Sequence, residues 1–154
     1  MKNIDLVLAK HPFFYGISEE FIPDLAILAD VVTFEPGDVL FKEGDAADKF
    51  YLIIKGKIAI QTAVSYNDAI TIQTVEDGEI VGWSWIVKPY KYKFGARVVE
   101  KTEMIVFNAE KLRTECEMDA ELGFEIMKLL VQAVSTRLEQ TRLLVLDVYG
   151  KNKK

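Results

Sequence analysis

The sequence is poor in the residues that most often carry metal binding and nucleophilic catalysis. It has 154 residues but a single cysteine, Cys116, and a single histidine, His11. One cysteine cannot close an intramolecular disulfide, and one Cys and one His far apart in the chain form no recognisable metal-ligand set. His11 precedes Pro12, where we expect a turn residue, and Glu115 and Glu117 should raise the pKa of the Cys116 thiol. We therefore expect a protein that is not an enzyme and holds no metal.

Long apolar segments and an excess of basic charge are also missing. The N-terminus has no continuous apolar run that would form a signal peptide, and no segment approaches the ~20 apolar residues of a membrane span. The 24 acidic residues outnumber the 19 basic ones, giving a net charge of −5. Proteins that read duplex DNA normally present a basic face. We therefore expect a cytoplasmic protein with no membrane contact and no direct DNA binding.

Apolar residues follow a helical period at both ends of the chain and a period of two between them. Residues 1–29 are predicted to form an N-terminal helical segment, in which Ser18 caps the second of two short helices. Residues 30–108 indicate roughly eight short strands, with Lys55-Gly56 as a hairpin turn between two of them. This pattern predicts a mainly β fold with flanking helices, in which an antiparallel jelly-roll (double-stranded β-helix) barrel forms the body.

Residues 109–150 are predicted to form a short helix and a long C-terminal dimerisation helix, followed by a basic tail at 151–154. Asn108 is expected to cap the short helix, which ends near Cys116, and Asp119 the long one, which ends near Asp147. Residues at alternating steps of four and three define a heptad seam along the long helix: Met127, Val131, Val134, Leu138, Thr141 and Val145. Because the chain has no second long helix to cover this seam, we expect a homodimer formed through it.

Residues 78–98 fit neither period and hold both tryptophans, two tyrosines and three lysines. A connection this rich in large aromatic side chains is expected to contact a ligand or another protein. The alternative is that the same rings close one end of the barrel by packing inside it.

Several glycine turns and two helical motifs follow one another as in a known family. The turns are Pro36-Gly37-Asp38, Glu43-Gly44-Asp45 and Gly78-Glu79-Ile80-Val81-Gly82, and the helical motifs are Arg137-Leu138 and Leu146-Asp147-Val148-Tyr149-Gly150. In these motifs the chain resembles the cyclic-nucleotide-binding domain, and more narrowly the sensory half of the catabolite-activator and fumarate-nitrate-reduction regulators. The resemblance implies a jelly-roll barrel followed by a dimer helix. It also implies a short form, because the regulators continue past the hinge into a helix-turn-helix.

The resemblance also implies a phosphate-binding cassette, and this sequence departs from it. The family has a Gly-Glu pair, whereas Gly82 is followed here by Trp83. Phe94 stands where the family has its phosphate-pairing arginine, or Lys93 if the register shifts by one residue. Neither tryptophan nor phenylalanine can replace an ionised group, and lysine lacks the bidentate fork of arginine. We therefore expect altered ligand specificity and no certain cofactor, with a small anionic or nucleotide-like ligand held by a candidate set: Gly82, Trp83, Ser84, Trp85, Lys93, Phe94, Ala96, Thr141 and Arg142.

These observations favour a non-enzymatic regulatory or sensor module with altered ligand specificity. One alternative is a protein-interaction module in which Trp83 and Trp85 fill the pocket and no small ligand binds. Others are an authentic receptor for cyclic AMP or cyclic GMP, a truncated transcription regulator, or a module that regulates DNA through a protein partner, for example in mixed dimers with a full-length regulator.

Overall fold

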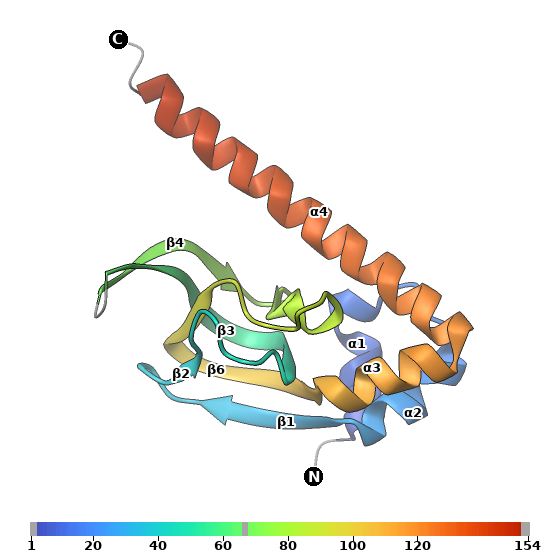
Figure 1. Cartoon of the computed structure of the whole chain (residues 1–154). Helices are drawn as coiled ribbons and strands as arrows, with labels where there is room; N and C mark the ends of the chain where they lie inside the picture. The colour runs from blue at the N-terminus through green and yellow to red at the C-terminus, as the bar shows by residue number, and fades with distance from the viewer. Residues whose placement is uncertain (1–2, 66–67, 152–154) are drawn as a thin grey trace.

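Two long strands, β3 (Lys49–Ser65) and β6 (Gly95–Asn108), form the centre of the fold (Figure 1). The computed structural model describes residues 3–65 and 68–151. The other strands in these residues are β1 (Ala29–Phe34), β2 (Val39–Phe41), β4 (Asp68–Glu76) and β5 (Ile80–Val81). The helices are α1 (Ile4–Lys10), α2 (Ile22–Ile27), α3 (Ala109–Met118), α4 (Ala120–Lys151) and the 3-10 helices η1 (Pro12–Phe14), η2 (Glu19–Phe21) and η3 (Trp83–Ile86).

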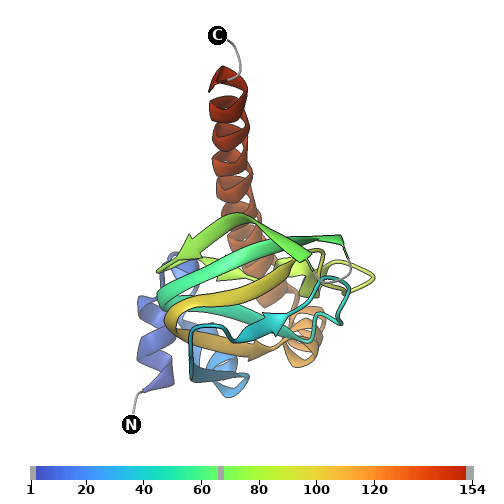
Figure 2. The ribbon, with the colours of Figure 1, turned by 90° about the vertical axis from the view of Figure 1, so that its left-hand side faces the viewer.

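All strand pairs in the sheet are antiparallel. The strands lie in the order β1-β6-β3-β4, while β2 pairs with β6 and β5 pairs with β3. The sheet curves strongly (Figure 2), but among the described residues no pair joins β4 back to β1, so it is not closed. The predicted fold class, mainly β with flanking helices and a long C-terminal helix, is confirmed, with an open curved sheet in place of a closed barrel.

The prediction of a hairpin at Lys55-Gly56 is wrong, because both residues lie inside the continuous strand β3. The ladder between β3 and β6 shifts register on either side of Lys55. A Cβ on Gly56 would lie 2.2 Å from Oγ1 of Thr102, and Gly56 has a φ of 144°. The glycine therefore marks a close approach between two strands and not a chain reversal. The described residues also contain six strands and not roughly eight, since residues 95–108 form the single long strand β6.

The helix starts at the C-terminal end follow the predicted caps. The Asn108 side chain accepts a hydrogen bond from the Lys111 amide at 3.0 Å, and that of Asp119 accepts one from Leu122 at 3.2 Å. The predicted cap at Ser18 is wrong: its side chain makes no capping bond to η2 and instead donates to the carboxylate of Glu125 on α4, at 3.0 Å to Oε2. This bond joins the N-terminal segment to the start of the long helix.

Aromatic rings fix the N-terminal segment to the sheet. Phe13 contacts Phe50 edge to face at 5.5 Å between centroids, and Phe14 contacts Phe107 at 6.0 Å. Phe50 also contacts Trp85 of η3 at 5.4 Å. Since such pairs add to the energy of burial, they form a continuous core between the N-terminal turn, the sheet and η3.

His11 lies in a turn, as predicted, and it is buried there among groups that define its tautomer. Its Nε2 donates to the carbonyl oxygen of Ile53 at 2.7 Å, since a carbonyl can only accept, and its Nδ1 accepts from the Phe13 amide at 3.1 Å. Burial lowers the pKa of His11, although the bond to Ile53 opposes this. A second proton would also occupy the nitrogen that accepts from Phe13. The folded protein therefore holds a neutral imidazole.

We expect protonation of His11 to lower the stability of the protein in mild acid. A histidine whose folded-state pKa is depressed contributes its full stability above its unfolded pKa of about 6.5, and this contribution is lost as the pH falls from there toward the folded-state pKa. Melting temperatures between pH 7.5 and 5 should fall more steeply for the wild type than for His11→Gln, which keeps a donor near Ile53. Parallel curves for the two proteins would contradict the prediction.

Helix α4 begins against the rest of the fold and then extends beyond it (Figure 1). Leu122, Ile126 and Leu130 are buried, whereas the described side chains from residue 138 onward are exposed. Across residues 3–65 and 68–151, neither α4 nor another helix has an apolar segment long enough to cross a membrane.

Candidate functional site

A cavity of about 260 Å³ lies between η3 and the loop that follows it, the strands, and helix α4. Six residues line it from the segment 82–94: Gly82, Trp83, Ser84, Tyr92, Lys93 and Phe94. Four line it from α4: Val134, Arg137, Leu138 and Thr141. The remaining lining residues, Phe41, Ile60, Ile72 and Gln73, come from β2, β3 and β4. The cavity is therefore built by segments far apart in the sequence.

The wall at Gly82 depends on the absence of a side chain. Gly82 has a φ of 81°, and a Cβ there would lie 3.0 Å from Cε1 of Tyr92 and 3.4 Å from Cε2 of Phe41. The rings of Phe41 and Tyr92 stack with centroids 3.6 Å apart, and the Tyr92 hydroxyl donates to the Lys49 carbonyl. Burial raises the pKa of Tyr92 well above its usual value. The stacked pair is therefore a fixed apolar wall.

The two tryptophans of η3 lie in different environments. Trp85 is fully buried, and its indole N–H has no hydrogen-bond partner among the described residues. Arg113 of α3 donates to the Trp85 carbonyl at 2.7 Å and stacks over the Tyr90 ring at 4.2 Å, which joins η3 to α3. Trp83 is only partly buried and lines the cavity. One indole belongs to the core, and the other faces the cavity.

The charged residues that line the cavity are both basic. They are Lys93, which is exposed, and Arg137, which is partly buried; the described lining contains no carboxylate. Gln73, Ser84 and Thr141 supply neutral polar groups. The site therefore combines apolar and aromatic walls with positive charge, which suits an anion that carries apolar surface.

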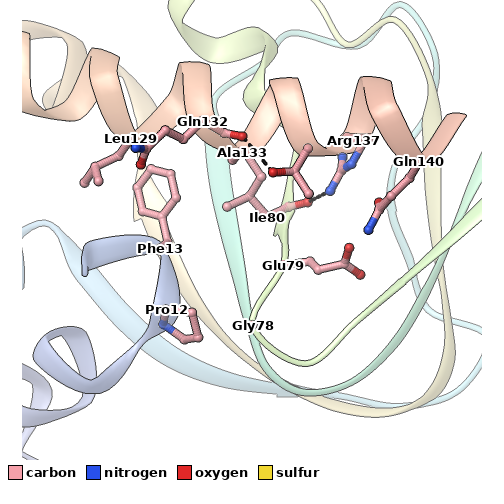
Figure 3. Close-up of a pocket in the computed structure, with 11 residues that line it drawn as sticks. Pro12, Phe13, Gly78, Glu79, Ile80, Leu129, Gln132, Ala133, Arg137 and Gln140 are labelled. Carbon is pink, nitrogen blue, oxygen red and sulfur yellow. Dashed lines mark hydrogen bonds between the residues drawn. The ribbon is translucent and has the colours of Figure 1, made fainter. Parts of the chain in front are cut away.

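Arg137 connects this cavity with a second one of about 240 Å³ on the side of the N-terminal turn (Figure 3). Its guanidinium donates to the carbonyl oxygen of Ile80 in β5. Glu79 and Gln140 line the second cavity beside it, and Gln140 also hydrogen-bonds Gln73 of β4 at 3.5 Å. Burial lowers the pKa of Arg137, and the carboxylate of Glu79 opposes this. The guanidinium remains charged at neutral pH, since arginine is effectively never deprotonated in proteins.

The structure brings six of the nine predicted ligand residues around the first cavity: Gly82, Trp83, Ser84, Lys93, Phe94 and Thr141. Trp85 and Ala96 are buried and are not among its lining residues. Arg142 is also absent from the lining and lies on the surface, 3.4 Å from the carboxylate of Glu139. Thr141 is the last residue of α4 that lines the cavity, and Arg142 lies beyond it.

Sequence reasoning missed Arg137 as a site residue. The available signal was its spacing, because residues four apart lie on one helix face and Arg137 precedes Thr141 by four. It also missed the neutral residues of the strands, for which the sequence carries no comparable signal, because their place depends on the curvature of the sheet.

The predicted heptad seam lies on the outer surface of α4. Val131, Leu138 and Val145 have exposed fractions of 62%, 68% and 62%, and Met127 is 43% exposed. Val134, Leu138 and Thr141 belong both to this seam and to the cavity wall. The seam and the cavity wall therefore overlap on one helix.

The described residues give little support for thiol chemistry or metal binding. Burial, followed by Glu115, Glu117 and Asp119, raises the pKa of Cys116 to about 11, which leaves little reactive thiolate at neutral pH. Residues 3–65 and 68–151 contain no group of three or more His, Cys, Asp or Glu side chains placed to hold a metal ion.

Comparison with known proteins gives consistent matches. The sequence profile of the cyclic nucleotide-binding domain matches residues 31–119. The anaerobic regulatory protein of Bacillus subtilis is 32% identical over 113 residues, which are 73% of this chain and 47% of the relative. A CRP-like cAMP-activated global transcriptional regulator of Mycobacterium tuberculosis is 22% identical over 149 residues, 96% of this chain and 66% of the relative. The chain thus spans less than two thirds of each relative's length.

Solved structures give the same fold. A cyclic nucleotide-binding domain from Methylobacillus flagellatus superposes with a TM-score of 0.76 at 20% identity, covering 94% of this chain and 81% of the other.

Proposed function

Because this chain belongs to the cyclic nucleotide-binding domain family, we propose that it is a non-enzymatic regulatory module that senses a small anionic ligand with a flat ring system. One observation carries this proposal. The cavity of about 260 Å³ has aromatic and apolar walls, and its charged lining residues, Lys93 and Arg137, are both cations. An anion would gain charge-assisted hydrogen bonds there, and a flat ring would gain contact with Trp83.

The same residues support a ligand specificity that differs from ordinary cyclic nucleotide recognition. The family glutamate that accepts from the ribose hydroxyl is replaced by Trp83, which is a donor only. Glu79, the acidic residue nearest in sequence, lines the neighbouring cavity instead. A buried ribose hydroxyl would then lack its acceptor, so we propose that a flat anion without a ribose binds better than cyclic AMP or cyclic GMP.

The alternative of a pocket filled by its own rings has support only at Trp85, which is buried in the core. Trp83 leaves the cavity open. We therefore favour a ligand-binding module over a protein-interaction module without a ligand.

We also propose that the protein acts as a homodimer through the heptad seam of α4. The support is the exposure of four apolar seam residues in the single chain: Met127, Val131, Leu138 and Val145. Because Val134, Leu138 and Thr141 line the cavity as well, a ligand would contact the helix that forms the dimer.

A ligand panel tests the proposed function. Calorimetry and thermal shift would compare 2-naphthoate with uncharged 2-naphthamide, together with cyclic AMP, cyclic GMP and adenosine. We expect the anion 2-naphthoate to bind most tightly. Trp83→Ala should weaken its binding about 10- to 100-fold, since an aromatic stacking contact is worth roughly 1–3 kcal/mol.

Tyr15→Ala removes an exposed aromatic ring, 64% accessible and absent from the cavity lining, and should leave the affinity unchanged. No binding by any member of the panel, or equal binding by Trp83→Ala and the wild type, would count against the proposal.

A further inference from the structure

We propose that Arg137 of α4, and not a residue of the loop, pairs with the anionic group of the ligand, and that it does so by leaving the carbonyl oxygen of Ile80. This inference rests on the proposed function, because it assumes that the cavity binds an anion. It identifies the guanidinium of Arg137 as the group that recognises the charge, and its hydrogen bond to Ile80 as the contact that must break. It also assigns a specificity-determining role to a residue outside the segment 82–96.

The position of Arg137 makes two arrangements of its side chain available. The residue lines both cavities, and in this structure its guanidinium points to β5 and donates to the Ile80 carbonyl (Figure 3). The side chain of Thr141, one turn further along α4, lines the first cavity, between α4 and the loop. Rotation of a long flexible side chain would bring the guanidinium to the ligand without displacing the helix.

The present contacts leave most of the guanidinium's hydrogen-bonding capacity unused. Arginine has five N–H donors, and within the described residues Ile80 is the acceptor to which Arg137 donates. Glu79 acts on the guanidinium through its charge, and the two form no ion pair within 4.0 Å among the described residues. Partly buried donors with a single neutral acceptor would gain from a carboxylate or phosphate that accepts two parallel bonds.

Lys93 is the weaker candidate for the same role. It is exposed on the loop, so its ammonium group is hydrated and screened by salt, and it offers a point charge without a planar fork. Arg137 is partly buried in a wall of apolar residues, where a charge-assisted bond contributes more. The anion should therefore depend mainly on Arg137.

An anion that takes Arg137 away from Ile80 would also remove a link between α4 and the sheet. Two hydrogen bonds join this part of the helix to the strands: Arg137 donates to β5, and Nε2 of Gln73 in β4 donates to Oε1 of Gln140. Ligand charge, and not ligand bulk alone, would then control how firmly α4 is held.

Two fluorescent probes that share one ring system test this assignment on the full chain. They are 1-anilinonaphthalene-8-sulfonate and its uncharged parent, N-phenyl-1-naphthylamine. We expect the ratio of their affinities to fall about 10- to 100-fold in Arg137→Gln, while the affinity for the uncharged probe changes less than about twofold. Arg137→Lys should retain part of the preference. Arg142→Gln, the same substitution on the same helix but away from the cavity, should leave the ratio unchanged.

Glu79→Gln tests the competition for the guanidinium. Removing the carboxylate that attracts Arg137 from the side of the second cavity should raise the affinity for the sulfonate probe about two- to fivefold. A fall in that affinity would overturn the proposed competition.

The two proposals fail in different ways. If Ile72→Trp, which adds bulk over the cavity, leaves the binding of both probes unchanged, the probes bind elsewhere and both proposals are overturned. If that variant blocks binding but Arg137→Gln keeps the wild-type ratio, the cavity binds the ring system and only the role of Arg137 is overturned.

Discussion

Replacing Gly56 with alanine is expected to destabilise the protein by about 3 kcal/mol or more, the largest loss we predict for the smallest possible side chain. The new methyl group would lie 2.2 Å from Oγ1, 2.6 Å from Cβ and 2.7 Å from Cα of Thr102. Thr102 is fully buried in β6, and part of the clash is with its backbone. Rotation of the Thr102 side chain therefore cannot relieve the clash. β3 and β6 must separate to accept the variant, and their pairing is the centre of the sheet. Denaturant unfolding at a fixed protein concentration measures the effect.

Gly37→Ala is the matched control, because Gly37 has a φ of 93° but a Cβ there would meet nothing within 4 Å. It should cost about 1–2 kcal/mol, the usual penalty for a left-handed residue with a side chain. The difference between the two variants isolates the contact with Thr102. Equal losses would contradict the close approach of the two strands.

Val131→Glu is expected to convert the proposed dimer to a monomer, weakening association by more than about 100-fold. A carboxylate in the middle of the apolar seam would be buried without a partner in the dimer, which costs about 3 kcal/mol or more. The side chain is 62% exposed in the single chain, so folding of the protomer should be unaffected. Sedimentation equilibrium across a range of concentrations measures the association constant.

Leu143→Glu is the control for added charge and lost apolar surface. Leu143 is 57% exposed and falls on the opposite side of α4 from the seam in the heptad pattern. It should leave the dimer intact. A wild-type protein that is monomeric at micromolar concentration, or equal association by Val131→Glu and the wild type, would show that the seam is not the interface.

Features determined by neighbours in sequence could be predicted, whereas features determined by distant segments could not. The caps at Asn108 and Asp119 depend on amides three residues away, so composition is enough to locate them. Glycine at a turn and glycine at a close approach look alike in a sequence, so only the contact with Thr102 distinguishes Gly56 from a hairpin residue. Ser18 has a good capping composition, but Glu125, more than a hundred residues away, takes its hydroxyl.

In the candidate site, too, local features could be predicted and features that depend on distant segments could not. The aromatic content of residues 78–98 identified this segment as unusual, but the sequence could not say that Trp85 enters the core while Trp83 faces the cavity. The sequence alone does not distinguish Arg137 from Arg142, since both are arginines of the same helix. The placement of α4 against β5 decides which of them reaches the cavity, and that placement depends on the whole sheet.

The way α4 leaves the fold has a mechanical consequence. Arg137 and Gln140 hydrogen-bond strands β5 and β4, and the helix continues to Lys151. At 1.5 Å per residue, roughly 20 Å of helix therefore extends past the point beside the cavity where α4 is hydrogen-bonded to the strands. A tilt of about 5° at that point would move the C-terminal end of α4 by about 2 Å. A displacement of α4 beside the cavity that is too small to rearrange the sheet would thus be amplified at the C-terminal end of the helix.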